Sequence, residues 1–200
     1  MLAGHSFGGL VAAEMARQDR QSLMRLNALA IIDTAAPDLQ QTVGLGWSQA
    51  QWIAHLSKIA SYMFGKPVNV ELSELDGVAE DVQITVFYRK LLDAAVIPNG
   101  TSVSFIAGLV NVYRANLSST YTIQQMRIQE VPIYVLRSVS EQPDDVVDEV
   151  TRRNRAVEDL GWGQFLGYPV SLRRIPGDHL TMLQGANAKV VAENLNRCFH

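Results

Sequence analysis

The first ten residues are "MLAGHSFGGL", in which Gly4-His5-Ser6-Phe7-Gly8 form the pattern G-x-S-x-G. This pattern is typical of a sharp turn between a strand and a helix, on which a nucleophilic serine is exposed. We expect the two glycines of the pattern, Gly4 and Gly8, to leave room for the bend. A strand must lead into such a turn, and only three residues, 1–3, precede it.

Two stretches after the turn extend this pattern. Residues 10–18 are rich in alanine, whose small side chain lets a helix pack closely on a sheet. Residues 26–34, "LNALAIIDT", contain an unbroken apolar run, as expected of a strand that is buried on both faces. The sequence therefore predicts a strand, a helix and a second strand.

From Pro37 to about Glu130 the apolar residues adopt helical spacing instead. One set, spaced by three or four residues, is Trp52, Leu56, Ile59 and Met63. Another such set is Val103, Ile106, Val110, Tyr113 and Leu117. A further helix is expected over about 78–95. These positions predict a helical block between two regions that contain strands.

The residues after this block again predict strands and helices in alternation. We expect strands in "VPIYVL" (131–136) and "YPVSLRRI" (168–175), a helix in 144–160 ending at Gly161, and a closing helix over Asn187–Cys198. Such alternation predicts a single α/β domain with a mainly parallel sheet that is covered on both faces. Binding sites in these sheets form at the carboxyl ends of the strands.

Three candidate chemical residues, Ser6, Asp33 and His179, each follow a predicted strand. Serine needs a neighbouring imidazole to take its proton and an acid to orient that imidazole. The order Ser, Asp, His is that of the α/β-hydrolases, and the backbone N–H of Phe7 is the candidate oxyanion donor. Taken alone, Asp33 also fits a turn-forming role and His179 a surface loop.

Other residues compete for these roles. Asp144 and Asp145 follow the strand "VPIYVL", where many α/β-hydrolases carry the acid. Asp178, beside the candidate base, is expected to shape its loop. The sequence does not favour the other histidines or the lone cysteine as catalytic groups; these are His5, His55, His200 and Cys198.

The composition bounds the possible partners and setting. The chain has 17 basic and 20 acidic residues, for a net charge of -3, without a block of either sign. It therefore predicts neither a nucleic acid nor a membrane surface as partner. A single cysteine excludes an internal disulfide and a thiolate metal cluster, which favours a reducing, cytoplasmic setting. Neither a signal peptide nor a membrane-spanning run is evident, and no metal motif is present.

Three stretches resemble the thioesterase domains that terminate nonribosomal peptide and polyketide synthases, and their stand-alone type II relatives. They are "GHSFGG" (4–9), "IIDTAAP" (31–37) and "GWGQFLGYPVSLRRIPGDHLTML" (161–183), and the resemblance covers nearly the whole chain. The ending G-D-H-x-x-M-L is the most specific element. The resemblance implies an α/β-hydrolase fold in which residues 40–119 form a lid over the acyl site.

The resemblance also implies roles for the candidate residues. Ser6 would take an acyl chain from the phosphopantetheine thiol of a carrier protein domain, with His179 as general base and Asp33 orienting it. Release by water would give an acid, and release by a group on the chain would give a lactone or lactam. The carrier protein supplies the phosphopantetheine, so no cofactor of the chain's own is expected. An apolar lid lined by Trp52, Phe87 or Phe105 would favour cyclisation if it excluded water.

The front of the chain departs from this family. Thioesterase domains have several strands and a helix before the nucleophile turn, and a loop there supplies the second oxyanion N–H. The chain therefore resembles the C-terminal part of such a domain, in which the four strands would be contiguous. Without a second donor, turnover is expected to be about 100- to 1000-fold lower. The alternatives are a generic serine esterase or lipase of the same fold and a non-catalytic remnant or interaction module.

Overall fold

The computed structural model describes residues 2–18, 26–39, 43–119, 131–144, 146 and 149–198. The chain divides into two compact units, which are described separately. The sheet unit comprises Met1–Gln41, Tyr121–Gln142 and Glu149–His200. The helical unit comprises Thr42–Thr120 and Pro143–Asp148.

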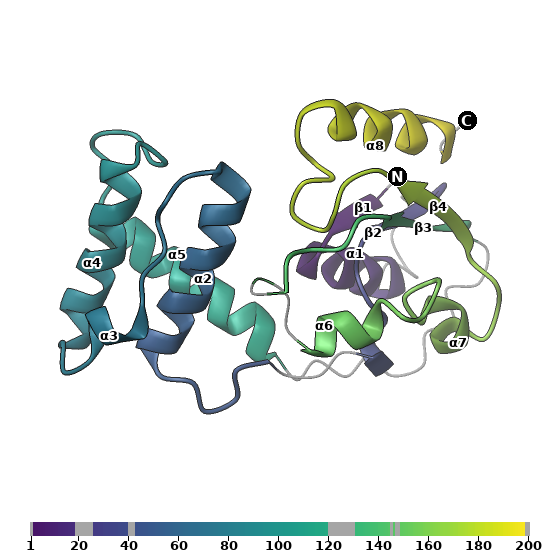
Figure 1. The fold of residues 1–200 in the computed structure, drawn as a ribbon. Coiled ribbons are helices and arrows are strands. Elements are labelled where there is room, and N and C mark those ends of the chain that lie inside the picture. The colour runs from purple at the N-terminus through teal and green to yellow at the C-terminus, as the bar shows by residue number, and fades with distance from the viewer. Residues whose placement is uncertain are drawn as a thin grey trace. The chain divides into compact units, whose positions relative to one another are not determined.

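The sheet unit is built on four parallel strands in the order β1-β2-β3-β4 (Figure 1). They are β1 (Leu2–His5), β2 (Leu29–Ile32), β3 (Ile133–Ser138) and β4 (Ser171–Ile175). In the register, His5 pairs with Ile32 and Ile32 with Leu136. The predicted parallel sheet is thus confirmed, and its strands end side by side along one edge.

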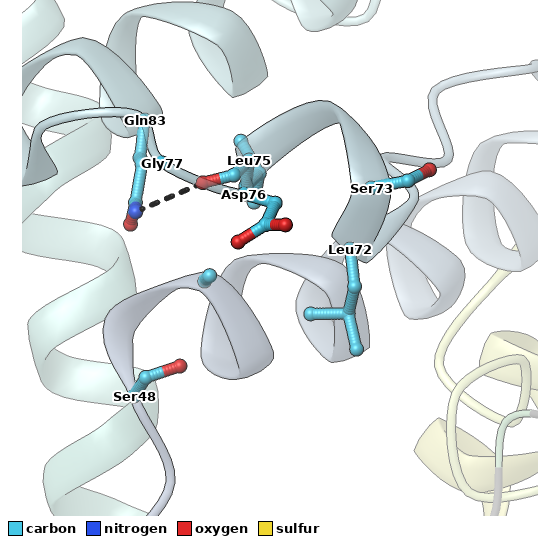
Figure 2. Close-up of a pocket in the computed structure, with 8 residues that line it drawn as sticks. Ser48, Leu72, Ser73, Leu75, Asp76, Gly77 and Gln83 are labelled. Atoms are coloured by element: carbon cyan, nitrogen blue, oxygen red, sulfur yellow. Dashed lines mark hydrogen bonds between the residues drawn. The ribbon is translucent and has the colours of Figure 1, made fainter.

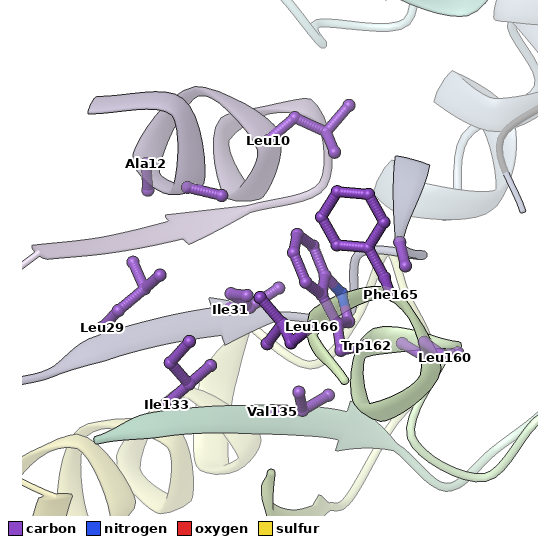
Figure 3. Close-up of a cluster of buried hydrophobic side chains, with 12 residues drawn as sticks. Leu10, Ala12, Leu29, Ile31, Ile133, Val135, Leu160, Trp162, Phe165 and Leu166 are labelled. Carbon is purple, nitrogen blue, oxygen red and sulfur yellow. The ribbon is translucent and has the colours of Figure 1, made fainter. Parts of the chain in front are cut away.

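Helices pack on both faces of this sheet. The helices of this unit are α1 (Phe7–Gln18), α6 (Glu149–Asn154), α7 (Trp162–Leu166) and α8 (Gly185–Cys198), and a short 3-10 helix, η2, spans Pro37–Leu39. Alternate residues of β2 point to opposite faces, so Ile31 packs with Leu10 and Trp162 (Figure 3). Ile32 packs with Met182 and Val191 on the other face. All four β2 residues are buried, which is why their run is apolar throughout.

One predicted helix is shorter than expected. Among the described residues of 144–160, α6 covers Glu149–Asn154, and turns follow it before α7 begins at Trp162; residues 145, 147 and 148 lie outside the described residues. Leu160 and Gly161 have positive φ angles of 55° and 84°. Leu160 and Trp162 are both buried in the core beneath the sheet. Packing of these two side chains therefore overrides the helical spacing of the segment.

The helical unit contains α2 (Gln49–Phe64), α3 (Leu72–Leu75), α4 (Glu80–Asp93) and α5 (Val103–Ser118). Ser48 caps α2 in a capping box with Gln51. Trp52 and Phe87 lie inside this unit's own core, each only 1% exposed, whereas Phe105 is 63% exposed. The first two side chains are therefore structural within the unit. The assignment of about residues 40–119 to a lid stays a prediction.

Candidate active site

Ser6 lies on the sharp turn between β1 and α1. Its φ angle is 56°, a left-handed conformation that is uncommon for a residue other than glycine. Neighbouring groups hold the turn: the Ser6 N–H donates to Ile32 O at 3.1 Å, and Thr34 Oγ1 donates to Ser6 O at 2.7 Å. The sheet and the segment after β2 therefore fix the backbone of the candidate nucleophile.

The turn depends on close approach at two glycines. A Cβ atom at Gly4 would lie 1.9 Å from Gly8 O, and one at Gly9 would lie 2.2 Å from Thr34 Oγ1. At Gly8 a Cβ atom would meet none of the described atoms within 4 Å. The expectation that Gly4 and Gly8 make room for the bend is therefore right for Gly4 and wrong for Gly8, since Gly9 has that role.

His179 connects the other two candidate residues. Its Nε2 lies 3.0 Å from Ser6 Oγ, and its Nδ1 lies 3.0 Å from Asp33 Oδ2. A carboxylate only accepts hydrogen bonds, so Nδ1 carries the proton and Nε2 presents its lone pair to the serine hydroxyl. The structure thus brings Ser6, His179 and Asp33 together in the arrangement that proton transfer from a serine requires.

Asp33 is buried and anchored at the carboxyl end of β2. Its Oδ1 accepts from Ser138 N, and its Oδ2 accepts from Ser138 Oγ, both at 2.8 Å. Burial raises the pKa of Asp33, but the hydrogen bond and charge of His179, the Ser138 N–H and the charge of Arg155 together outweigh it and lower the pKa to about 2. The carboxylate is therefore ionised at neutral pH and can stabilise a protonated imidazole.

Arg155 surrounds this carboxylate with further hydrogen bonds. Its Nη1 donates to Asp33 Oδ2 at 3.3 Å and to Ser138 Oγ at 3.0 Å. Its Nη2 donates to Ser138 O at 2.9 Å and to Ser140 O at 3.1 Å. The guanidinium side chain is only 15% exposed, so it forms a largely buried ion pair with Asp33. Nothing in the local sequence around Arg155 indicates this role.

The loop after β4 positions His179 through Asp178. The Asp178 carboxylate accepts from Leu180 N at 2.8 Å, from Thr181 N at 3.1 Å and from Thr181 Oγ1 at 2.8 Å. These contacts agree with the predicted loop-shaping role of Asp178. They fix the backbone on the C-terminal side of the candidate base.

Phe7 occupies the first position of α1, immediately after Ser6. The first N–H groups of a helix have no acceptor within the helix, and they bear partial positive charge. Among the described residues, none accepts a hydrogen bond from the Phe7 N–H. This group is therefore free to donate to an oxyanion formed at the serine.

Asp144, His55 and Cys198 are the remaining competing candidates that the structure describes. Asp144 is exposed, and Asp145 and His200 lie outside the described residues. His55 belongs to the helical unit, where its Nδ1 lies 2.8 Å from Tyr113 Oη. Cys198 is buried on α8, and burial raises the pKa of its thiol. His179 Nδ1 donates its hydrogen bond to Asp33 Oδ2.

A separate pocket of about 410 Å³ lies in the helical unit (Figure 2). Gln83, one of its lining residues, donates to Leu75 O at 3.4 Å and to Val78 O at 2.9 Å. The remaining lining residues are Ser48, Ala50, Leu72, Ser73, Leu75, Asp76 and Gly77. The pocket contains no part of the Ser6 site. Within the described ranges, no group of three His, Cys, Asp or Glu side chains could hold a metal, and no helix could span a membrane.

The chain matches one family model and is similar to several solved structures. A family model described as "Thioesterase domain" matches residues 1–199. No curated protein sequence matches the chain. Among solved structures, the chain is similar to a four-domain nonribosomal peptide synthetase bound to AMP and glycine, with 22% identity and a TM-score of 0.76. It is also similar to the Vlm2 thioesterase domain (20%, 0.58) and to BorB, a type II thioesterase from the borrelidin biosynthetic cluster (21%, 0.53).

These alignments cover almost all of this chain but only part of the others. The alignments with the synthetase and with Vlm2 each include 98% of this chain, and the alignment with BorB includes 99% of it. The chain spans 14% of the synthetase, 66% of the Vlm2 domain and 65% of BorB. At these identities the solved structures establish the α/β-hydrolase fold of thioesterase domains, which confirms the predicted fold class.

Proposed function

Because the chain belongs to the thioesterase domain family, of the nonribosomal peptide and polyketide synthase type, we propose that it releases acyl chains from a carrier-protein thioester through Ser6, His179 and Asp33. One observation carries this proposal: His179 lies 3.0 Å from both Ser6 Oγ and Asp33 Oδ2. Family membership supports the reaction class, and the geometry supports the residues that perform it.

The first half of the reaction transfers the acyl chain to the enzyme. Ser6 Oγ attacks the thioester carbonyl while its proton passes to His179 Nε2, and the Asp33 carboxylate stabilises the imidazolium that forms. The Phe7 N–H donates to the tetrahedral oxyanion. When the intermediate collapses, the C–S bond breaks, and the departing thiol takes the proton from His179. The products are the acyl-Ser6 ester and the free phosphopantetheine thiol.

The second half releases the chain. His179 removes a proton from water, whose oxygen attacks the acyl-Ser6 carbonyl. When this intermediate collapses, the C–O bond to Ser6 breaks and His179 returns the proton to Ser6 Oγ, which gives an acid and free Ser6. An alcohol or amine on the acyl chain can replace water and give a lactone or lactam. The described residues supply one backbone oxyanion donor, Phe7, next to Ser6. We therefore expect turnover about 100- to 1000-fold below that of a site with two donors.

The proposed partner is an acyl or peptidyl carrier protein domain, in a cytoplasmic setting. One of the similar solved structures is a four-domain nonribosomal peptide synthetase, which supports a carrier-linked substrate. Phosphopantetheine then arrives with the substrate, and the three proposed catalytic groups are all side chains of this protein. A generic esterase or lipase of the same fold, or a non-catalytic interaction module, is the alternative.

A kinetic comparison tests this function. One acyl chain is presented on a carrier protein, as a free phosphopantetheine thioester and as a matched oxyester. We expect release from the carrier protein to have the highest kcat/KM, and Ser6→Ala to abolish it. Equal rates on the oxyester would favour a generic esterase. No release from any substrate by the folded wild-type protein would favour the interaction module.

A further inference from the structure

His5 contacts the candidate base at two points, although it lies 174 positions away in sequence. Its Nε2 lies 3.0 Å from the backbone oxygen of His179. Its ring stacks on the His179 ring, with centroids 4.7 Å apart and planes inclined by 29°. One residue therefore contacts both the backbone and the side chain of the base.

The His5 backbone is itself fixed relative to Ser6. His5 is the last residue of β1, where it pairs with Ile32, and it immediately precedes Ser6. His179, by contrast, lies in the loop between β4 and α8. The hydrogen bond from His5 therefore links that loop directly to the strand that presents the nucleophile.

Resting on the function proposed above, we propose that His5 is a positioning residue, which holds His179 at hydrogen-bonding distance from Ser6 by tethering its backbone and packing against its ring. A carbonyl oxygen only accepts, so His5 must donate from a protonated Nε2. That tautomer leaves the His5 ring uncharged. An uncharged ring is the appropriate neighbour for His179, which gains a positive charge in each half-reaction.

The surroundings keep His5 in this form. Burial lowers the pKa of His5, and so does the positive charge of His179. The charge of Asp33 and the hydrogen bond to the His179 carbonyl raise the pKa by a smaller amount. The resulting pKa of His5 is about 4. His5 is thus uncharged at neutral pH. A second cation in contact with the imidazolium would oppose proton transfer from Ser6 to His179.

Two substitutions separate the tether from the ring. His5→Phe keeps an aromatic ring but loses the donor, whereas His5→Gln keeps an N–H donor but loses the ring. His55→Phe is the matched control, because it replaces a histidine of the helical unit. Circular dichroism and thermal unfolding establish that each variant is folded. The readouts are the rate of labelling by a small fluorophosphonate and the kcat and KM of a short acyl thioester.

We expect His5→Phe to label about 10- to 100-fold more slowly than the wild type, with kcat reduced and KM unchanged. His5→Gln should recover a substantial part of that loss, and His55→Phe should label within twofold of the wild type. Wild-type rates in His5→Phe would overturn the proposal. Equal losses in His5→Phe and His5→Gln would also overturn the tether.

A measurement independent of activity keeps the two proposals distinguishable. Long-range ¹⁵N–¹H spectra of the wild-type imidazoles report which nitrogen of His5 is protonated. The tether predicts the Nε2–H tautomer at neutral pH, and an Nδ1–H tautomer or a doubly protonated ring would overturn it. A wild-type protein that shows the Nε2–H tautomer but fails to label would support the tether and contradict the proposed function.

Discussion

Asp33 and Ser138 are joined by two 2.8 Å hydrogen bonds between the ends of neighbouring strands, one from the Ser138 backbone N–H and one from its hydroxyl. Asp33 follows β2 and Ser138 ends β3, so the two meet at the carboxyl edge of the sheet. Ser138, at the end of β3, thus fixes the carboxylate of Asp33, which follows β2. This arrangement holds the Asp33 carboxylate where its Oδ2 lies 3.0 Å from His179 Nδ1.

Substitution of Asp33 tests the choice of acid. Asp33→Asn preserves the size of the side chain but removes its charge, so the favoured His179 tautomer changes. We expect kcat on an acyl thioester to fall by about 10⁴-fold. Asp144→Asn is the matched control and should keep wild-type turnover. A large loss in Asp144→Asn with little loss in Asp33→Asn would assign the acid to the segment after β3.

Removal of Arg155 should destabilise the fold at neutral pH. Arg155→Met leaves the buried, ionised Asp33 without its ion-pair partner, at a cost of about 3 kcal/mol in the free energy of unfolding. The folded-state pKa of Asp33 is about 2, below its ordinary value of 3.8, and loss of Arg155 removes one cause of that lowering. The loss in free energy of unfolding caused by Arg155→Met should therefore become smaller as pH falls and the Asp33 carboxyl group becomes protonated. Urea unfolding at pH 7 and pH 2.5, close to the folded-state pKa of Asp33, measures both effects, and an unchanged loss would contradict the assigned pair.

His5 should make stability depend on pH in a mildly acidic range. Its folded-state pKa of about 4 lies below the ordinary value of 6.5, so between these values the unfolded chain binds a proton that the folded chain does not. The wild type should therefore lose about 2 kcal/mol more than His5→Gln between pH 7 and pH 4.5. Parallel urea titrations of the two proteins isolate this contribution. Equal losses in both would show that His5 is not held neutral.

Two glycines of the serine turn should respond oppositely to alanine. A Cβ atom at Gly4 meets the backbone oxygen of Gly8, so Gly4→Ala should cost about 3 kcal/mol or prevent folding. Gly8 lies in α1 with open space around its Cα, so Gly8→Ala should raise stability by up to about 1 kcal/mol. Thermal unfolding of the two variants measures the contrast. Equal destabilisation by both would contradict the geometry of the turn.

Local sequence predicted most of the sheet unit. The buried run before Asp33, the serine pattern and the strand before His179 each have a local signature, so the carboxyl-edge placement of the three candidate residues followed from them. The break after α6 could not be predicted, because helical spacing continues through it. After Asn154 the chain forms turns, and Leu160 and Trp162 pack in the tertiary core, a contact that local sequence does not reveal.

The supporting residues of the site were missed for the same reason. Arg155 reaches Asp33 across 122 positions, and His5 reaches His179 across 174. Such contacts leave no periodic pattern in one sequence. The position of Gly9 beside the serine pattern is a weak indication of its role. A side chain is excluded at Gly9 because Thr34, which follows the next strand, lies against it. Contacts between distant segments therefore determined which neighbours of the three candidate residues support the site.

The most direct test of the account is intact-mass analysis after labelling with a fluorophosphonate serine probe. The wild type is compared with Ser6→Ala once circular dichroism shows both to be folded. We predict one covalent adduct on the wild type, located at Ser6, and none on Ser6→Ala. A folded wild type that takes no label, or an adduct that persists in Ser6→Ala, would contradict the claim that His179 and Asp33 activate Ser6.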